Sequence, residues 1–286
     1  MINLNNPEDR DKLASRIEED IDAYCAEHYD HGHRNHLGAS DLGEECWRKL
    51  WYNFRWTKEE VFDGRMLRLF NVGHQAEPRF VSYLRGIGFE VKEFDENRKQ
   101  FHISGAKGHY GGSLDGMCKT PKHYEISEDI IISLSFKTNN TGSGYNKVAE
   151  EHLSKAKPKH WAQECQYGYK TGIRYCIYMI ENKNDSDITV KIVELDWNLG
   201  AQLEKKAEDI IFAKEPPPRI SENPSFFNCK YCNFSGICHK NEPVEINCRS
   251  CRNAEPIEDA QWYCHKFNNT IPKDFISKGC DHHLGI

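Results

Sequence analysis

The sequence predicts an α/β fold, because helix patterns and strand patterns alternate along residues 66–214. The strongest strand pattern runs from Asp129 to Thr138, where β-branched and apolar residues are dense. A helix pattern over 66–87 and a short strand over 89–91 precede it. A second helix begins at Pro158, since proline is favoured in a first helical turn, and two strands and a helix follow over 174–181, 188–195 and 198–214.

The composition describes a soluble protein with one core and an appendage. The chain has 286 residues, of which 38% are hydrophobic. No apolar run reaches the roughly 18–20 residues that span a bilayer, and the N-terminus lacks a signal-peptide pattern. We therefore expect no membrane association and a cytoplasmic location, in a bacterium or a phage-infected host. The net charge of −6 argues against DNA binding by electrostatics alone, but it is compatible with an enzyme whose metal ions supply a positive field.

A helix over residues 7–30 precedes this core. Its apolar residues recur at helical spacing, so we expect a packed face made by Leu13, Ile17, Ile21 and Tyr24. Ser40 is a candidate N-cap for the next helix, which carries inward-facing aromatic residues.

Two charged residues stand at the ends of neighbouring predicted strands. In the segment Gly111–Gly116, a predicted strand ends at Asp115 and the chain turns at Gly116. Lys137 lies near the end of the apolar strand. A carboxylate and a lysine placed in this way can hold a divalent metal ion and activate a water molecule beside a phosphodiester. Glu77 lies four residues after Gly73, which puts a carboxylate and backbone room on one face of the preceding helix.

This ordered set resembles the PD-(D/E)XK nucleases of the RecB-like branch, in which an Asp and then a Glu-x-Lys lie on adjacent strands. The resemblance covers about residues 40–240 and implies a central mixed sheet flanked by helices. It implies that Mg²⁺ or Mn²⁺ is bound by Asp115, by Glu77 and by the main-chain carbonyl of Phe136. Lys137 would then orient the attacking water and stabilise the charge that develops.

The helix after Pro158 carries a second match to that branch. Gln163 and Tyr167 are four residues apart, hence on one helix face, as in the Gln-x-x-x-Tyr motif that follows Glu-x-Lys. The resemblance implies that they position the DNA strand. A basic patch just before them could hold phosphates, and it is formed by Lys155, Lys157, Lys159 and His160.

One position departs from the family pattern, because Ser135 stands where the motif has its glutamate. In some restriction enzymes of the superfamily a Ser-x-Lys variant takes its acid from a later helix. Glu150 follows Lys137 after twelve residues, with Glu151 next to it, and is the first candidate for a migrated acid. Glu164 is the second candidate. The remaining possibility is that the change at Ser135 inactivates the site.

Twelve cysteines without a secretion signal indicate metal ligation rather than disulfides. Three of them form the pattern Cys229-x2-Cys232-x5-Cys238, which supplies three corners of a cubane cluster, and the early Cys46 is the candidate for the fourth. This set resembles the cluster of AddB-type and CRISPR-adaptation nucleases, which implies a 4Fe–4S cluster that joins the tail to an early helix. Zinc is the alternative, since four sulfur ligands suit either.

A second group follows at the C-terminal end. Cys248-x2-Cys251, Cys264 and Cys280 have the spacing of a structural zinc site, which a short segment needs in order to fold. Histidines compete as ligands, and His283 is the most credible substitute.

The predicted organisation is a helical region over 1–60, a nuclease core over 61–218, an iron–sulfur segment over 219–242 and a zinc knuckle over 243–286. The predicted function is a Mg²⁺- or Mn²⁺-dependent deoxyribonuclease, an exonuclease of phage type in DNA recombination, repair or replication. Its partners would be DNA and other recombination or replication proteins. The alternatives are a DNA-binding or scaffold protein that kept the fold and lost activity with the glutamate, and an adaptor that works through protein contacts.

Overall fold

A five-stranded mixed sheet forms the centre of the protein. The computed structural model describes residues 3–29, 32–126, 130–142 and 144–286, so Asp129 lies outside the described residues. The strand order is β2 (Glu90–Lys92), β5 (Gly116–Lys119), β6 (Ile132–Asn139), β7 (Tyr175–Asn182) and β8 (Ile188–Glu194). Strands β6 and β7 run parallel, and the other neighbours are antiparallel. The predicted α/β fold with a central mixed sheet is confirmed.

The two faces of strand β6 differ in chemistry. Because side chains alternate along a strand, Ile132, Leu134 and Phe136 share one face and form part of a buried apolar cluster. Ser135 and Lys137 therefore belong to the opposite face. The sequence of this strand thus separates a packing face from a polar face in the middle of the sheet.

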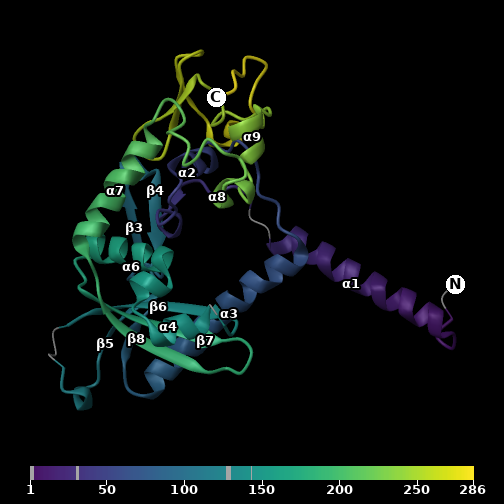
Figure 1. Ribbon diagram of the computed structural model, residues 1–286. Helices are drawn as coiled ribbons and strands as arrows, with labels where there is room; N and C mark the ends of the chain where they lie inside the picture. Colours follow the sequence, from purple (N-terminus) through teal and green to yellow (C-terminus); the bar gives the residue numbers. More distant parts are fainter. Residues whose placement is uncertain (1–2, 30–31, 127–129, 143) are drawn as a thin grey trace.

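Helices cover both faces of the sheet (Figure 1). Helix α3 (Gly64–Gly86) packs on the apolar face of β6 through Ala76, Phe80, Val81 and Leu84. Helices α4 (Tyr145–Glu150) and α5 (Leu153–Ala156) pack on the other face, against Cys176, Tyr178 and Ile180 of β7.

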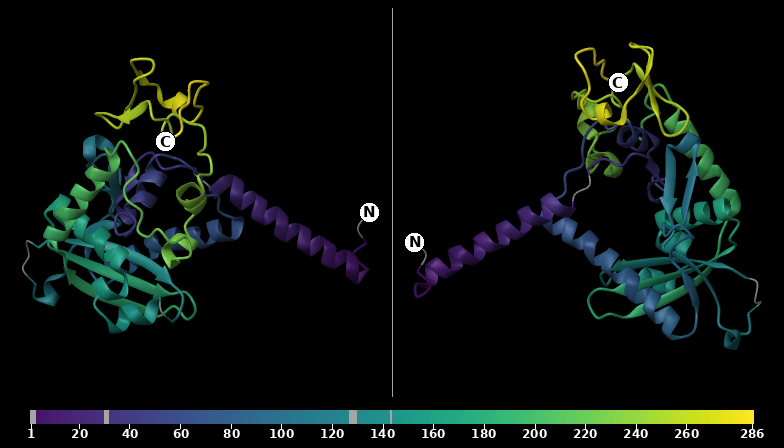
Figure 2. Two further views of the ribbon diagram at one scale, coloured as in Figure 1. Left: turned by 45° about the horizontal axis from the view of Figure 1, so that its top comes forward. Right: turned by 180° about the vertical axis from the view of Figure 1, so that it is seen from behind.

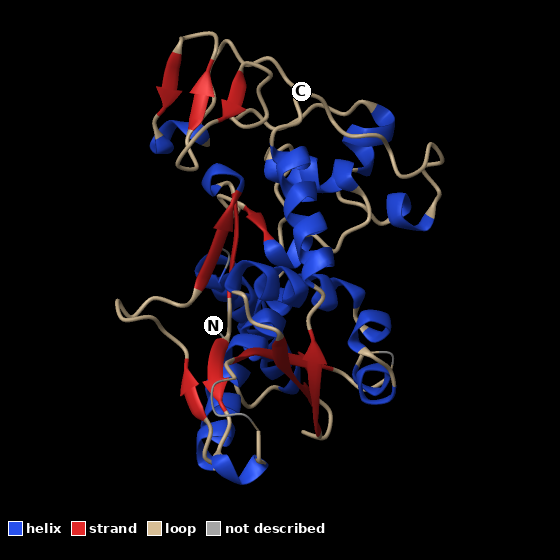
Figure 3. Ribbon diagram, turned by 90° about the vertical axis from the view of Figure 1, so that its left-hand side faces the viewer, coloured by secondary structure: helices blue, strands red, loops and turns tan. Residues whose placement is uncertain are grey.

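Helix α6 (Pro158–Thr171) begins at the predicted proline and ends at Gly172, whose φ of 74° is the left-handed conformation that glycine adopts at low cost. It packs against α7 (Trp197–Ile211). A smaller sheet lies beside α6, with the order β1 (Leu37–Gly38), β4 (Tyr110–Ser113) and β3 (His102–Gly105) (Figure 3). Asp115 therefore follows a strand of this small sheet and precedes β5 of the central one. Short 3₁₀ turns span Ala39–Asp41, Ala106–Gly108 and Lys122–Tyr124.

Helix α1 (Pro7–Tyr29) has the predicted extent but not the predicted packing. Ile17, Ile21 and Tyr24 are 50%, 47% and 54% exposed, and the helix projects away from the body of the protein (Figures 1 and 2). Its last turns hold it to α3, where Asp22 accepts a hydrogen bond from Arg68. The expectation of a packed face was wrong because helical spacing of apolar residues does not supply a partner surface.

Helix α2 (Trp47–Phe54) begins seven residues after Ser40, so the predicted cap at Ser40 is wrong and Cys46 occupies the cap position. The segment before α2 contains the short 3₁₀ turn Ala39–Asp41 and packs on α6. A Cβ atom on Gly43 would lie only 2.7 Å from the Cα of Lys159, which shows how closely the two backbones approach.

The C-terminal part follows α7 and returns to α2. It contains α8 (Phe227–Lys230), α9 (Ser235–Lys240), an antiparallel sheet and α10 (Lys273–Ile276). The sheet has the order β11 (Asn269–Ile271), β10 (Trp262–Cys264) and β9 (Ala254–Pro256). Trp262 joins the same buried cluster as Trp51 and Phe54 of α2. None of the helices in the described part of the chain combines the length and the apolar character that a membrane crossing requires.

Candidate active site

Asp115 and Lys137 meet at the end of strand β6. The Lys137 Nζ lies 3.6 Å from the Asp115 Oδ2, and the same oxygen accepts a hydrogen bond of 2.7 Å from the main-chain N–H of Phe136. The structure thus brings together the carboxylate and the lysine that the sequence places on neighbouring strands.

Glu164 lies next to Ser135. The Ser135 hydroxyl donates a hydrogen bond of 2.8 Å to Glu164 Oε1, and the Cys176 thiol lies 3.6 Å from Glu164 Oε2. Glu164 reaches this position from helix α6 and is buried, as is Ser135. A carboxylate therefore occupies the space beside the serine that replaces the motif glutamate.

Two carboxyl groups of the site have strongly raised pKa values. Burial raises the pKa of Glu164 to about 7, and the charge of Asp115 adds to the effect while Lys137 opposes it. Burial likewise raises the pKa of Glu77 to about 7, again with a contribution from Asp115. Glu77, Asp115 and Glu164 therefore form a group of acids in which the charge of Asp115 disfavours ionisation of the other two, a situation that a bound cation relieves.

Lys137 remains a cation in this setting. Burial disfavours its charge, but the carboxylates of Asp115 and Glu164 outweigh burial and raise the pKa of Lys137. His160 lies near Lys137, and its Nδ1 is 2.7 Å from the Tyr178 hydroxyl. Burial and the charge of Lys137 lower the pKa of His160 to about 3, so this histidine is neutral at physiological pH and adds no charge to the basic patch predicted around it.

Gln163 and Tyr167 share one face of α6, as their spacing predicts. The Gln163 side-chain amide donates a hydrogen bond of 2.9 Å to the Tyr167 hydroxyl. Burial, followed by the charge of Glu164, raises the pKa of Tyr167, so its hydroxyl remains protonated and can donate.

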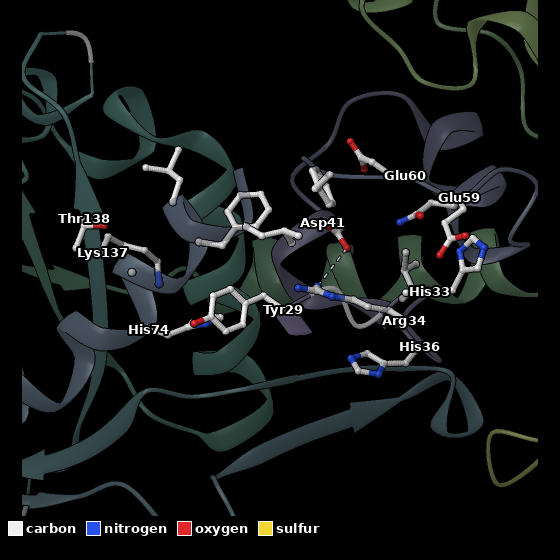
Figure 4. A pocket seen from close by; sticks show the side chains of 18 of the residues that line it. Tyr29, His33, Arg34, His36, Asp41, Glu59, Glu60, His74, Lys137 and Thr138 are labelled. Atoms are coloured by element: carbon white, nitrogen blue, oxygen red, sulfur yellow. Dashed lines mark ion pairs between the residues drawn. The ribbon is translucent and has the colours of Figure 1, made fainter. Parts of the chain in front are cut away.

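A cleft of about 720 Å³ reaches the site at Glu77, Phe136 and Lys137 (Figure 4). Glu77, Lys137 and His74 line one end, and Figure 4 shows Lys137 and His74 facing Arg34 and Asp41 across it. The Arg34 Nη1 lies 3.7 Å from Asp41 Oδ2. The cleft is thus lined by both cations and anions.

The first candidate for the migrated acid lies elsewhere on the surface. Glu150 is the last residue of α4, and both it and Glu151 are exposed. In the described residues, neither contributes to the pKa shifts of Glu77, Lys137 or Glu164. The geometry favours Glu164 as the candidate acid.

The three lysines of the predicted basic patch have different surroundings. Lys155 and Lys159 are exposed, whereas Lys157 is half-buried and burial lowers its pKa. Lys159 donates a hydrogen bond of 2.8 Å to Glu44, which also accepts one of 2.9 Å from Lys49. Burial of Glu44 opposes its ionisation, but these two lysines prevail and lower its pKa to about 2. Part of the positive charge of Lys159 is therefore already compensated.

The four cysteines of the first group line one cavity, between α2 and the segment that carries α8 and α9. They are Cys46, Cys229, Cys232 and Cys238. Burial raises the pKa values of Cys229 and Cys232, and the nearby thiols of Cys46 and Cys238 contribute to both shifts. His239 also lines this cavity, with a buried Nε2 that has no hydrogen-bond partner in the described residues.

The second group is close together as well. Burial raises the pKa of Cys248, and the thiols of Cys280, Cys251 and Cys264 contribute in that order. His283, the predicted substitute ligand, is 2.9 Å from the Ser250 hydroxyl through its Nε2. That contact engages one of the two ring nitrogens through which His283 could bind a metal.

The donor groups are not arranged around a single ion. Across residues 3–29, 32–126, 130–142 and 144–286, no three His, Cys, Asp or Glu side chains are positioned to hold a metal ion. The carboxylates fit a hard divalent cation in chemistry, and the thiolates fit a softer centre. Binding would therefore require side-chain rotation, most simply of Asp115 away from the Phe136 N–H.

Comparison with known proteins gives distant similarity only. No family model matches the chain, and no curated protein matches it. Among solved structures it is similar to SSO0001, at 18% identity and a TM-score of 0.45, over 78% of this chain and 96% of that one. It is also similar to the alkaline exonuclease LHK-Exo from Laribacter hongkongensis, at 16% identity and a TM-score of 0.41, over 67% of this chain and 90% of that one. The LHK-Exo complex with dAMP gives 18% identity and the same TM-score. All three scores are below 0.5, so they carry no argument about the activity of this chain.

Sequence reasoning did not identify His74, Arg34 or Asp41 as cleft residues. For His74 a signal existed, because it lies three residues before Glu77 and hence on the same helix face. Arg34 and Asp41 lie on either side of the short strand β1, and no periodic pattern marks them as facing the cleft.

Proposed function

We propose that this protein is a metal-dependent deoxyribonuclease, an exonuclease that acts in DNA recombination, repair or replication. The observation that carries the proposal is the hydrogen bond between Ser135 and Glu164 beside the Asp115–Lys137 pair. It supports a nuclease site in which the acid has moved from strand β6 to helix α6. The position of the oxygen atoms matters for chemistry, and the element that carries them does not.

The side chain of Ser135 is short, which leaves room beside β6 for a carboxylate from another element. Glu164 fills this room and keeps its orientation through the Ser135 hydroxyl and the Cys176 thiol. Asp115 and Glu164 both act on Lys137, since their charges raise its pKa. Asp115, Lys137 and Glu164 therefore form one electrostatic unit.

Mg²⁺ or Mn²⁺ would be held by Asp115, Glu77 and Glu164, with the main-chain carbonyl of Phe136. Supporting this assignment, the carboxyl groups of Glu77 and Glu164 have pKa values of about 7, so they resist ionisation until a cation is present. When bound, such an ion polarises the phosphodiester and lowers the pKa of bound water.

The protein groups would supply orientation and charge. Lys137, a cation beside Asp115, would hold the attacking water and stabilise the negative charge that develops on the phosphate. The Tyr167 hydroxyl and the Gln163 amide would position the strand. Lys155, Lys157 and Lys159 would contact phosphates, with Lys159 contributing least because Glu44 already pairs with it.

The cysteine groups would bind structural centres. A 4Fe–4S cluster suits Cys46, Cys229, Cys232 and Cys238, because its four irons each take one thiolate and the sulfurs need not surround a single point. Zinc is the alternative there. Zn²⁺ suits Cys248, Cys251, Cys264 and Cys280, and the contact of His283 with Ser250 supports cysteine as the fourth ligand.

The test is a cleavage assay on end-labelled single- and double-stranded DNA with Mn²⁺, after anaerobic purification. We expect Lys137→Ala to reduce cleavage by at least about 10³-fold, because it removes a charge that acts in the transition state. The matched control is Lys99→Ala, an exposed lysine that lies outside the basic patch and does not line the cleft, which should remain within about threefold.

Cleavage by the unaltered protein that Lys137→Ala leaves intact would contradict the proposed site. Absence of cleavage by the unaltered protein, with DNA still bound, would favour a DNA-binding or scaffold protein instead.

A further inference from the structure

Two aromatic side chains stand exposed on helix α8. Phe227 is 72% exposed and Tyr231, the residue after the helix, is 68% exposed. They are four residues apart, and their ring centroids lie 5.3 Å from each other in an edge-to-face arrangement. Large aromatic rings left in water next to a cleft are typical of a binding surface.

Tyr231 of this pair lines a hollow that lies next to the cleft. A second hollow of about 210 Å³ is lined by Tyr231 and Lys159. It shares Asp41, Asn53 and Glu60 with the cleft that contains Glu77 and Lys137. The two hollows therefore adjoin at these residues, and the path from Lys137 to Tyr231 runs along both of them.

The charges along this path determine whether the bases or the phosphates of a nucleic acid would bind there. Lys230 places its ammonium 5.3 Å from the Tyr231 ring, which gives the aromatic end a positive charge. Asp41 and Glu60 line the shared section and repel phosphates, whereas Lys49 and Lys159, which line the second hollow, are already paired with Glu44. A strand in this path would gain affinity from its bases rather than from its backbone.

We propose that Phe227 and Tyr231 form a stacking platform for the bases of a DNA single strand whose end lies at Lys137. This inference rests on the proposed nuclease function and specifies its substrate as single-stranded over the length of the path. Bases stack on aromatic side chains whatever their identity, whereas in a duplex their faces are already stacked on one another. The platform therefore discriminates by strandedness and not by sequence.

The first cysteine group would hold this platform in place. Cys229 and Cys232 flank Tyr231 in sequence and line the cavity with Cys46, which belongs to the start of α2. Anchoring both sides of Tyr231 to the start of α2 fixes the rings relative to the cleft. This gives the cysteine group a role in substrate binding without any part in the chemistry.

The experiment measures binding of fluorescein-labelled oligothymidylates by anisotropy, without divalent metal so that no strand is cut. For a strand of about 20 nucleotides, we expect the double variant Phe227→Ala/Tyr231→Ala to raise Kd by about 10- to 100-fold. A fully double-stranded oligonucleotide of the same length should bind both proteins equally, because its bases are already stacked on one another. Tyr231→Trp should retain tight binding, since tryptophan also stacks.

The matched control is Phe94→Ala, an exposed aromatic residue that lines neither hollow. Circular dichroism and the iron or zinc content verify that each variant keeps its fold and its cysteine site. An unchanged Kd for the long strand in the double variant overturns the platform. A raised Kd supports the platform even if the unaltered protein fails to cleave DNA, so failure of the nuclease function is seen separately.

Discussion

Two buried charged side chains of this protein have opposite surroundings. Glu164 and Arg249 are each 1% exposed. Glu164 lies among other charged and polar groups, with Ser135 donating to it and Lys137 and Asp115 acting on its pKa. Its charge is coupled to groups that can change their protonation or take up a cation.

Arg249 has no carboxylate partner in the described residues. Its guanidinium lies 4.4 Å from the ring centroids of both Phe54 and Trp56, and 4.8 Å from that of Trp262. Its Nη1 donates a hydrogen bond of 3.2 Å to the Asn35 carbonyl, whereas Nε and Nη2 have no partner in the described residues. Burial, and then the charge of Arg55, lowers its pKa.

The two side chains therefore differ in role. The charge of Glu164 acts on the candidate active site, whereas the charge of Arg249 holds parts of the fold together. Arg249 comes from the C-terminal cysteine segment, and the rings of Phe54 and Trp56 belong to the end of α2 and the residues after it, so this cation joins two distant parts of the chain. Glu164 joins α6 to β6, but its effect falls on Lys137 and Asp115. We therefore expect substitutions of Glu164 to change activity and substitutions of Arg249 to change stability.

The largest expected effect is on activity at Glu164. Glu164→Gln should lower kcat/KM by about 10³-fold, because it removes the proposed metal-binding carboxylate. The free energy of unfolding should not fall, since the amide oxygen can still accept from Ser135 and a buried charge is lost. Cleavage rates and denaturant unfolding of the same preparations measure both.

A more specific test exchanges Ser135 and Glu164. Ser135→Glu alone should not increase activity, because the new carboxylate would be forced against Glu164 in a buried space. The double variant Ser135→Glu/Glu164→Ser should recover activity relative to Glu164→Gln. Glu150→Gln is the control and should cleave like the unaltered protein, while a loss there would identify Glu150 as the acid.

The second effect is on stability at Arg249. Arg249→Ala should lower the free energy of unfolding by about 3 kcal/mol, through the cavity it leaves and the loss of three cation–π contacts. Cleavage per folded molecule should stay within about threefold, because the guanidinium does not contact the site. Arg65→Ala, at an exposed position of α3, is the control and should cost less than about 0.5 kcal/mol. An inactive but stable Arg249→Ala protein would contradict this assignment, because it would show that Arg249 acts on activity and not on stability.

The residues around Glu164 could be predicted from the sequence in part. Asp115 and Lys137 could be paired because strand ends that are neighbours in a sheet lie close together. The choice between Glu150 and Glu164 could not be made, since spacing along the chain does not reveal how α6 is rotated against β6. Periodicity predicts that a helix forms, and it leaves open which of its faces finds a surface, as the exposed apolar residues of α1 also show.

The packing of Arg249 among aromatic rings was not predicted. Arg249 stands between Cys248 and Cys251, so the segment was interpreted only through its thiols, and an arginine in a short polar turn gives no sign of burial. Its burial depends on three aromatic rings from segments far apart in the sequence, which only the folded chain brings together. Long-range packing of this kind has no local pattern.

The smallest effect is the pH dependence of stability, which also distinguishes the two charges. Glu164 has a native pKa of about 7, above its unfolded value of 4.5, so between these pH values the native state holds a proton that the unfolded chain has lost. Stability of the metal-free protein should therefore fall as pH rises, by about 1–2 kcal/mol between pH 5 and pH 7.5. Glu164→Gln should reduce this slope and leave the part that Glu77 contributes, since the pKa of Glu77 is also about 7. Arg249→Ala should lower the whole curve and leave its slope unchanged, because the guanidinium stays protonated in this range. Chemical denaturation across pH with a chelator present measures both slopes, and an unchanged slope in Glu164→Gln would show that the buried carboxyl does not retain its proton.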